Sequence, residues 1–357
     1  MDYKDFTTEQ QKVIDSTEDF IVVNSCASSG KTETLTEKVR QVLRAGTISP
    51  SKIVVFTFTN NAAEVLRQRL GADFKDGIFV GTIHSYVNSL LTAKGIDTSS
   101  IIIEEKFDDL FNLISDNLYC INEVDYLFLD EAQDSTDMQF KVILDYIKPK
   151  KWLFIGDWRQ SIYGFRGSRP DILLDLAKRP DVKTYNLTKN FRNSKAILNF
   201  AKRLINLAGL DYMDTSIPAR DNIGIVYDIK YDLNELIRGI RKSKDEYRDW
   251  FILARTNAQV DEITERMEEL KLPYCTFKRN ELTPDQLKEK MEENSVKVLT
   301  IHAAKGLERK NVIVVGARLY NTEEKCLSYV AATRARDMLI WTTMPKKNQR
   351  EKRMYEW

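Results

Sequence analysis

The sequence predicts an α/β protein with two lobes of similar size, each a mostly parallel sheet flanked by helices. Apolar, strand-like runs alternate with helical patterns from end to end, which is the order that parallel sheets require. One such run, at residues 20–25, leads through a loop of small residues into a helical pattern. The length of 357 residues is enough for about two domains with separate cores.

Ten strands are expected from short runs rich in β-branched or aromatic residues. The first lobe should contain Ile21–Val23, Ile53–Phe56, Ile78–Thr82, Val124–Leu129 and Trp152–Ile155. The second lobe should contain Ile223–Tyr227, Phe251–Ala254, Val296–Thr300, Val312–Val315 and Met338–Trp341. The changeover falls near Asp181–Leu187, so we expect lobes at residues 1–185 and 186–357.

The stretch between the third and fourth strands is less regular. Its apolar residues predict two or three short helices, as a reduced insertion at about residues 86–123. Within it, Ile101–Ile103 is either a strand or a buried connector, and periodicity does not separate the two.

Composition limits the class of protein. Hydrophobic residues make up 43% and charged residues 30%, which is typical of a soluble globular chain. No apolar stretch approaches the roughly 18 residues of a membrane span, and the first ten residues lack the apolar core of a signal peptide. We therefore expect a cytoplasmic protein without a membrane partner, in the host cytoplasm if the source is viral.

Cysteine and charge patterns give weaker indications. Four cysteines without a C-x-x-C pair (Cys26, Cys120, Cys275 and Cys326) argue against a zinc or iron–sulfur site and favour a reducing compartment. The formal charge of +1 means that any nucleic-acid surface must be local. A basic cluster near the end of the sequence is weighted as an ordinary solvated run: Lys346, Lys347, Arg350, Lys352 and Arg353.

The loop after the first strand, SCASSGKT, predicts a phosphate site. Backbone N–H groups of Ser28, Ser29 and Gly30 and of the helix start are donors without internal partners. Lys31 adds a positive charge at the β- and γ-phosphates, and the Thr32 hydroxyl is suited to hold Mg²⁺. Ser25 occupies the place of the first glycine of the usual pattern. The alternative is a serine-rich turn that only caps the next helix.

A second motif supports the phosphate reading. The strand Leu127–Leu129 ends in Asp130 and Glu131, and parallel sheets bind ligands at the carboxyl ends of their strands. Beside a phosphate loop, Asp130 would hold Mg²⁺ and Glu131 would polarise an attacking water. Together the two motifs predict nucleotide hydrolysis.

Further motifs, in order, resemble those of superfamily 1 DNA helicases of the UvrD/PcrA/Rep type. They are TFTNNAA (57–63), DEAQD (130–134), GDWRQSIYGFRG (156–167), NFR (190–192), RTNAQ (255–259), TIHAAKGLE (300–308) and YVAATRA (329–335). Together with Gln10 and the phosphate loop, the ordered set spans Gln10 to Arg334. The resemblance implies two RecA-like lobes with ATP in the cleft between them.

The resemblance also implies roles at the nucleotide. Gln10 would read the adenine edge, and Phe191, which replaces a family tyrosine, would stack on the base. Gln160 would sense the γ-phosphate, and Glu308 would contact the sugar side. Arg192 and Arg334 would be arginine fingers from the second lobe, where a guanidinium is worth about 10³–10⁵ in rate. The alternative for both arginines is a salt bridge on the lobe surface.

For the nucleic acid, the resemblance implies single-stranded DNA across both lobes. Aromatic candidates for base stacking are Phe58, Tyr163 and Phe165, the last in place of a family tryptophan. Polar candidates are Asn60, His84, Arg166, Asn257 and His302. For the two histidines a core role is an equal alternative, and aromatic residues at strand ends usually belong to the core.

The sequence departs from the family at several places. The inserted subdomains of larger relatives are reduced to Tyr86–Glu123 and absent between Val260 and Leu299, where we expect a helix, a strand and a connection. The strand-separating hairpin has little room in Gly316–Glu324, although Arg318–Tyr320 would make a blunt substitute. Asn61, where lysine is common, and Glu33 remove positive charge. These departures weaken the case for duplex unwinding more than for ATP hydrolysis.

The leading hypothesis is an ATP- and Mg²⁺-dependent DNA helicase or translocase that moves 3′ to 5′ on single-stranded DNA and on tailed duplexes. The alternative is a DNA-stimulated ATPase, a translocase or clamp subunit, that needs a protein partner for loading or unwinding. An RNA substrate is a third reading that no visible 2′-hydroxyl-reading feature supports. A nucleotide kinase or GTPase is disfavoured, because it would not need the two arginines. Oligomeric state and pathway are not predicted.

Overall fold

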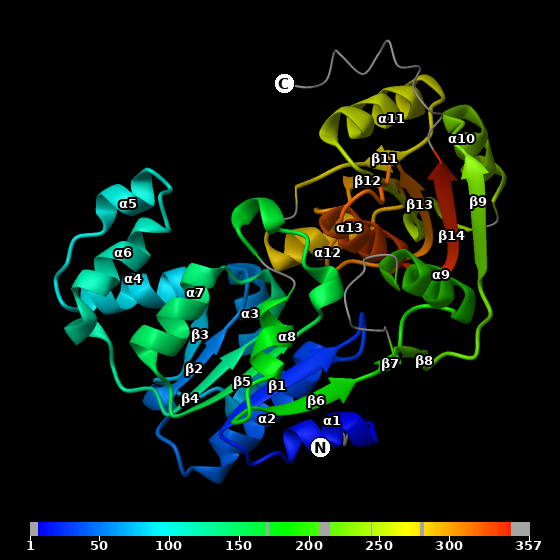
Figure 1. Ribbon diagram of the computed structural model, residues 1–357. Coiled ribbons are helices and arrows are strands. Elements are labelled where there is room, and N and C mark those ends of the chain that lie inside the picture. The colour runs from blue at the N-terminus through cyan, green and yellow to red at the C-terminus, as the bar shows by residue number, and fades with distance from the viewer. Residues whose placement is uncertain (1–5, 169–170, 207–214, 244, 279–281, 344–357) are drawn as a thin grey trace. The chain divides into compact units, whose positions relative to one another are not determined.

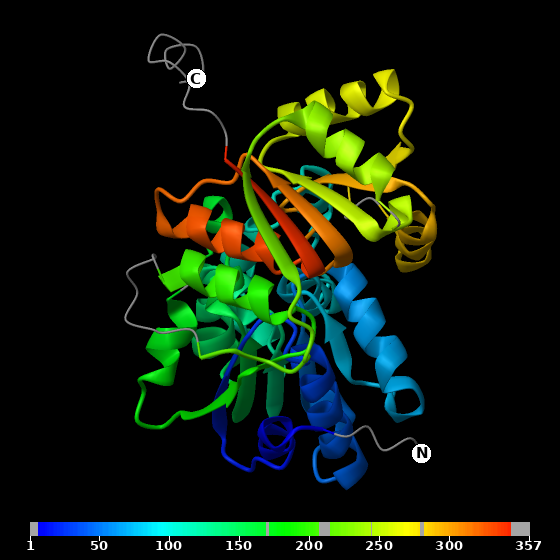
Figure 2. The same cartoon turned by 90° about the vertical axis from the view of Figure 1, so that its right-hand side faces the viewer.

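The computed structural model describes residues 6–168, 171–206, 215–243, 245–278 and 282–343. The chain divides into two compact units between Lys189 and Asn190. Each unit contains a six-stranded sheet with helices on both faces (Figures 1 and 2). The fold class expected from the sequence, α/β with two largely parallel sheets, is therefore confirmed. The basic cluster at residues 346–353 lies outside the described residues.

The sheet of the first unit is parallel throughout, in the order β3-β2-β4-β5-β1-β6. Its strands are β1 (Phe20–Ser25), β2 (Ile53–Phe56), β3 (Phe79–Gly81), β4 (Tyr126–Leu129), β5 (Lys151–Gly156) and β6 (Lys183–Leu187). Five of them coincide with expected strands to within three residues at either end, because each carries an apolar run buried on both faces.

Helices cover both faces of this sheet. Side chains alternate along β1, so Ile21 and Val23 pack toward one face and Val22 toward the other. The first face carries α1 (Thr8–Ile14), α2 (Lys31–Ala45) and α3 (Asn60–Leu70). The second face carries α4 (Ile83–Ala93), α6 (Asp109–Asp116), α7 (Asp137–Lys141) and α8 (Ile172–Ala177). The short helix α5 (Ser99–Ile103) precedes α6.

Two features of this unit differ in detail from what the sequence suggested. The segment 183–187, near the expected changeover between lobes, is strand β6 of the first unit, which pairs with β1 from Ile21 to Ser25. Its sequence, KTYNL, is polar because an edge strand is half-exposed, so it gave no apolar signal. The run Ile101–Ile103 is neither a strand nor a buried connector. It lies in α5, with Ile103 81% exposed.

The sheet of the second unit is also parallel, in the order β11-β12-β10-β13-β14-β9. Its strands are β9 (Ile225–Lys230), β10 (Trp250–Ala254), β11 (Tyr274–Cys275), β12 (Val296–Thr300), β13 (Arg309–Val315) and β14 (Ala335–Thr343). All five expected strands of this lobe are present. A separate two-stranded ladder joins β7 (Lys189–Asn190) to β8 (Ile217–Pro218).

Helices again flank the sheet. The helices α10 (Leu233–Lys242) and α11 (Asn257–Glu269) pack on one face through a shared apolar cluster. On the other side, α9 (Lys195–Asn206) and α13 (Thr322–Ala332) pack against each other and contact β14, where Phe200 meets Trp341 edge-on. The segment 260–299 holds the expected helix and strand and also a helix that was not expected, α12 (Pro284–Glu292).

Lys38 and Lys297 are buried among backbone carbonyls. The ammonium of Lys38 donates to the carbonyls of Ile14 and Ser16, and that of Lys297 donates to the carbonyls of Glu293 and Ser295. Burial lowers the pKa of each to about 8. The physical reason is that a buried ammonium loses more hydration than these carbonyls replace.

All four cysteines are buried thiols. Over the described residues, no cluster of His, Cys, Asp and Glu is suited to hold a metal by itself. Within the same ranges, none of the helices has the length and apolarity to cross a membrane.

Candidate nucleotide and nucleic-acid site

The carboxyl edge of the first sheet collects most of the predicted residues. Following the strand order, β3 leads to His84, β2 to Phe58, β4 to Asp130, β5 to Asp157 and β1 to the phosphate loop. Because β5 lies between β4 and β1, the loop after β5 lies between the two nucleotide motifs. Carboxyl edges of parallel sheets are where such folds bind ligands.

The segment SCASSGKT joins β1 to α2, in the strand–loop–helix order expected from its sequence. Ser28 and Gly30 adopt left-handed backbone conformations, with φ of 55° and 78°. Gly30 is the residue just before α2, and its φ of 78° favours glycine; a Cβ there would also come within 2.5 Å of the Gln10 side-chain amide. Ser25, in place of the first glycine, donates from its hydroxyl to the carbonyl of Gly156 at 2.7 Å. Its side chain therefore ties the loop to β5.

Gln10 lies against this loop. Its carbonyl oxygen accepts from the backbone N–H of Thr7 at 2.8 Å, which closes a capping box at α1. Its amide nitrogen donates to the carbonyl of Ser29 at 3.0 Å. The helix that carries Gln10 is thus attached directly to the phosphate loop.

Thr32 and Asp130, the two residues expected to hold Mg²⁺, are hydrogen-bonded to each other. The Thr32 hydroxyl donates to the Asp130 carboxylate at 2.8 Å. Burial and the nearby charge of Glu131 raise the pKa of Asp130, and Lys31 and Thr32 offset this only in part. A hydroxyl and a carboxylate are hard oxygen ligands, and a buried carboxylate that is hard to ionise gains from a cation. These residues fit Mg²⁺.

Glu131 has an unusual backbone conformation. Its φ of 50° and ψ of 41° are left-handed, which costs a residue with a side chain about 1–3 kcal/mol. Its carboxylate lies 3.5 Å from the Lys31 ammonium and accepts from the amide of Gln133 at 2.6 Å. Such strain persists only where the surroundings enforce it, and it is common at active sites.

Asp157 is the centre of a buried network next to the loop. Its carboxylate accepts from Arg159 Nε at 2.6 Å and from Gln160 Nε2 at 2.7 Å. Arg159 also donates to the carbonyl of Ser25, and the backbone N–H of Asp157 donates to the side-chain oxygen of Gln133 at 3.0 Å. This network holds Gln160, the predicted γ-phosphate sensor, beside both nucleotide motifs.

Three aromatic rings form a platform near this edge, defined here as Phe58, Tyr163 and Phe165. The rings of Phe58 and Tyr163 are stacked with centroids 4.9 Å apart, and Phe165 meets Tyr163 edge-on at 6.0 Å. Phe165 is 66% exposed, so it is not a core residue. Asn60 is exposed at the start of α3, two residues after Phe58. The side chain of Arg166 lies outside the described part of the structure.

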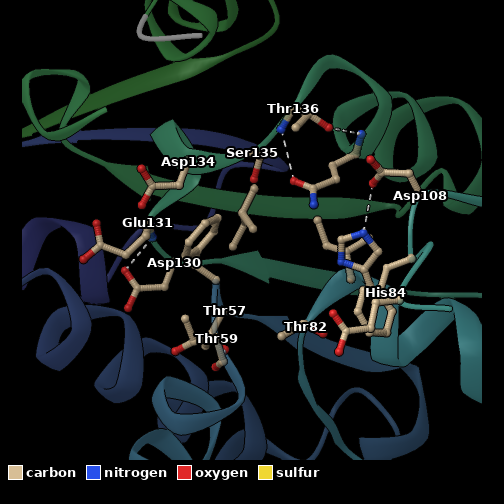
Figure 3. A pocket seen from close by; sticks show the side chains of 16 residues that line it. Thr57, Thr59, Thr82, His84, Asp108, Asp130, Glu131, Asp134, Ser135 and Thr136 are labelled. Atoms are coloured by element: carbon tan, nitrogen blue, oxygen red, sulfur yellow. Dashed lines mark hydrogen bonds and ion pairs between the residues drawn. The ribbon is translucent and has the colours of Figure 1, made fainter. Parts of the chain in front are cut away.

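A pocket of about 460 Å³ opens between the platform and the insertion (Figure 3). Asp130, Glu131 and Asp134 line one side, and His84 and Asp108 line the other. Thr57, Thr59, Thr82, Ser135 and Thr136 lie between the two sides.

His84 packs against the insertion and also lines the pocket. Its ring stacks on Phe111 at 4.6 Å, and Nε2 lies 3.3 Å from the carboxylate of Asp108. Burial lowers the pKa of His84, with Asp108 opposing the shift. The ring therefore packs on α6 of the insertion and also faces the pocket.

In the second unit, the predicted nucleotide residues gather at the amino ends of β13 and β14. Arg192 donates to the Glu308 carboxylate and, at 3.1 Å, to the carbonyl of Thr333. Arg334 is 1% exposed and donates to the carbonyls of Val330 and Leu307. Burial works to raise the pKa of Glu308, but Arg192, Arg336 and Arg334 outweigh it, so this pKa is lowered.

The remaining residues of this unit lie elsewhere. Asn257 and His302 follow the neighbouring strands β10 and β12, at the carboxyl edge of the sheet. In this unit the predicted nucleotide residues and nucleic-acid residues therefore lie at opposite edges. Phe191 is 45% exposed, as a stacking ring must be. The segment 316–321 between β13 and α13 is short, with Tyr320 68% exposed.

Several residues were not singled out by sequence reasoning. Gln133, Asp157 and Arg159 were inside the quoted motifs, but their spacing does not show that they bond to one another. Arg255 forms an ion pair with the buried Glu324 in the first turn of α13. The two residues are 69 positions apart in the sequence. Glu33, noted as a loss of positive charge, lies 3.4 Å from Arg69. Long-range pairs of this kind leave no local signal.

Two largely parallel sheets, with a phosphate-loop motif and a carboxylate pair on one sheet edge, define a RecA-like α/β protein. The UvrD/REP helicase N-terminal domain matches residues 6–118 and 115–181, and the UvrD-like helicase C-terminal domain matches residues 276–346. The chain belongs to the UvrD-like helicase family.

Curated relatives agree with this assignment. The putative ATP-dependent DNA helicase YjcD of Bacillus subtilis is 23% identical over 364 residues, covering 75% of this chain and 48% of the relative. ATP-dependent DNA helicase PcrA of Leuconostoc citreum is 24% identical over 370 residues, covering 74% and 49%. PcrA of Staphylococcus aureus is 24% identical over 372 residues, covering 75% and 50%. The chain spans about half the length of the curated relatives it matches.

Proposed function

We propose that this protein is a DNA-stimulated ATPase that translocates 3′ to 5′ on single-stranded DNA. The observation that carries the proposal is the carboxyl edge of the first sheet. There the pair Thr32–Asp130 and the ring pair Phe58–Tyr163 lie just after four consecutive strands of the sheet, and the Asp157 network joins the loop after β5 to the phosphate loop. The binding of single-stranded DNA and the hydrolysis of ATP would therefore share one set of loops.

Each residue has a role that its chemistry supports. The phosphate loop and Lys31 would hold the β- and γ-phosphates, and Thr32 with Asp130 would hold Mg²⁺. When bound, Mg²⁺ neutralises charge on the phosphate oxygens. Glu131 would accept a proton from the attacking water, and Gln160 would sense the γ-phosphate by contacting it. Gln10 and Phe191 would contact the adenine, and Glu308 the sugar side.

Closure of the two units on ATP is part of the proposal. Arg192 and Arg334 would then reach the phosphates and stabilise the charge that develops during hydrolysis. Reopening would release the products and pass bases across the platform, at about 1–3 kcal/mol per stacked base. Asn60, His84, Arg166, Asn257 and His302 would contact the strand.

A translocase or clamp that needs a protein partner to unwind duplex is the second candidate, and two observations favour it. The insertion is limited to short helices around α5 and α6, and only residues 316–321 join β13 to α13. Neither segment has the size of a strand-separating element. Leu319 and Tyr320, 38% and 68% exposed, would make a blunt wedge at most.

The test is steady-state ATPase with no nucleic acid, with single-stranded DNA and with single-stranded RNA, together with displacement of 3′-tailed and 5′-tailed duplexes. We expect stimulation by DNA, and Lys31→Ala should abolish turnover while Lys12→Ala, an exposed lysine of α1, leaves it unchanged. Displacement of the 3′-tailed duplex supports autonomous unwinding, and stimulation without displacement supports the partner-dependent translocase. ATPase that ignores DNA would overturn the proposal.

A further inference from the structure

We propose that Gln133 is a positioning residue. It would transmit the effect of single-stranded DNA binding at the aromatic platform to the carboxylate of Glu131. This inference rests on the proposed function and names the residue through which DNA would stimulate hydrolysis. Gln133 is fully buried, and it bonds to the catalytic candidate on one side and to the loop after β5 on the other.

The side-chain amide of Gln133 is used at both ends. Nε2 donates to Glu131 Oε2 at 2.6 Å, and Oε1 accepts from the backbone N–H of Asp157 at 3.0 Å. The residue has no exposed surface, so water cannot replace a bond that is lost. The orientation of the amide and the position of Asp157 are therefore linked.

The backbone of Gln133 makes a second link to the same loop. Its carbonyl accepts from the Ser161 hydroxyl at 3.0 Å. Gly156, just before Asp157, approaches so closely that a Cβ there would lie 2.5 Å from Gln133 Oε1. The segment 156–161 thus meets Gln133 at three points, and close packing prevents it from shifting without moving the amide.

Two of the three platform rings, Tyr163 and Phe165, lie on the next residues of this segment. Ile162 is fully buried, and Tyr163 stacks on Phe58. A base that stacks on the platform must rearrange these rings, and the displacement passes through Ser161 and Asp157 to Gln133. At the other end, Glu131 is in a left-handed conformation outside any regular element, so its carboxylate depends on side-chain partners for its orientation.

The experiment compares Gln133→Met with the wild-type protein in ATPase assays with and without single-stranded DNA. Methionine keeps the volume and removes both polar atoms. We expect the KM for ATP and the Kd for single-stranded DNA to stay within about twofold of the wild-type values. The DNA-stimulated kcat should fall tenfold or more and the basal kcat much less, so that the stimulation factor approaches one. A residue that only fills space would not change this factor.

Gln139→Met is the matched control, because Gln139 lines the pocket that Glu131 also lines, and its amide caps α7 by accepting from Thr136 N–H at 3.0 Å. Its stimulation factor should match the wild type. If Gln133→Met does not fold, Ser161→Ala, which removes the bond to the Gln133 carbonyl, must lower the factor at constant KM. A wild-type factor in the folded variant overturns this inference alone. Wild-type ATPase that ignores DNA overturns the proposed function as well.

Discussion

Thr32 and Asp130, 98 residues apart in the chain, are joined by a hydrogen bond of 2.8 Å between a hydroxyl and a carboxylate. Thr32 belongs to the first turn of α2, which follows β1, and Asp130 follows β4. Strand β5 lies between β4 and β1 in the sheet. The bond places a hydroxyl oxygen and a carboxylate side by side, next to Lys31 and Glu131. These two residues would hold Mg²⁺, which would neutralise charge on the phosphate oxygens.

Thr32→Val should therefore impair Mg²⁺ use rather than folding. Valine keeps the shape and removes the hydroxyl, so we expect kcat for ATP to fall at least tenfold and the Mg²⁺ concentration for half-maximal rate to rise. Thr32→Ser should retain most of the activity. Thr36→Val is the control, since the buried Thr36 hydroxyl donates only to the carbonyl of Thr32 among the bonds described for it. Equal effects of both valine variants would contradict the metal role.

Arg334→Lys should lower the maximal hydrolysis rate with little change in the KM for ATP. Lysine keeps the charge but loses the planar fork, and an arginine finger contributes about 10³–10⁵ in rate. Steady-state kinetics measures the change in hydrolysis rate, and a melting curve measures any loss of stability. Both are needed because Arg334 is buried. Arg220→Lys is the control, because it removes a comparable guanidinium fork, one that binds Asp337 and backbone carbonyls. A higher KM at unchanged kcat would exclude the finger role.

Phe165→Ala should weaken the binding of single-stranded DNA without destabilising the fold. The ring is 66% exposed, so its burial contributes little to stability, whereas a lost stacking contact costs about 1–3 kcal/mol. We expect Kd to rise roughly 5- to 150-fold in fluorescence anisotropy. Phe74→Ala, at the opposite end of α3 from Phe58, serves as the exposed-ring control. Unchanged Kd together with a lower melting temperature would make Phe165 a structural residue.

Stability should rise with pH above about 8, because Lys38 and Lys297 are buried. Burial lowers each pKa from 10.5 to about 8, so the unfolded chain binds more protons than the folded chain between these values. The cost of burying the ammonium is present in full below pH 8 and is relieved as pH rises toward 10.5. Each pKa unit corresponds to about 1.4 kcal/mol, so each lysine contributes a few kcal/mol at most.

Urea denaturation at pH 7.5, 9 and 10 measures this effect. In Lys38→Met the rise in unfolding free energy should be smaller than in the wild type, and Lys297→Met provides the matched change in the second unit. If both variants keep the wild-type pH dependence, the rise comes from other groups.

The fold was predictable where burial leaves a pattern. The strand Ile53–Phe56 was placed at its observed bounds, because it is buried on both faces. The edge strand β6 and helix α5 were not, since polar edge residues and exposed isoleucines break the usual relation between hydrophobicity and structure. The phosphate loop and the carboxylate pair were visible because their spacing is local. Gln133 was not, because its role depends on a contact with Asp157, 24 residues away.

The buried cysteines have a practical consequence. Cys26, Cys120, Cys275 and Cys326 are shielded from solvent, and a shielded thiol reacts slowly with maleimides. The natural chain is therefore a suitable background for site-specific labelling. A cysteine introduced at an exposed position such as Lys12 in the first unit, with another at Arg238 of α10 in the second, would carry a donor and an acceptor dye. Energy transfer between them would then measure, molecule by molecule, whether the spacing of the two units changes when nucleotide and DNA are added.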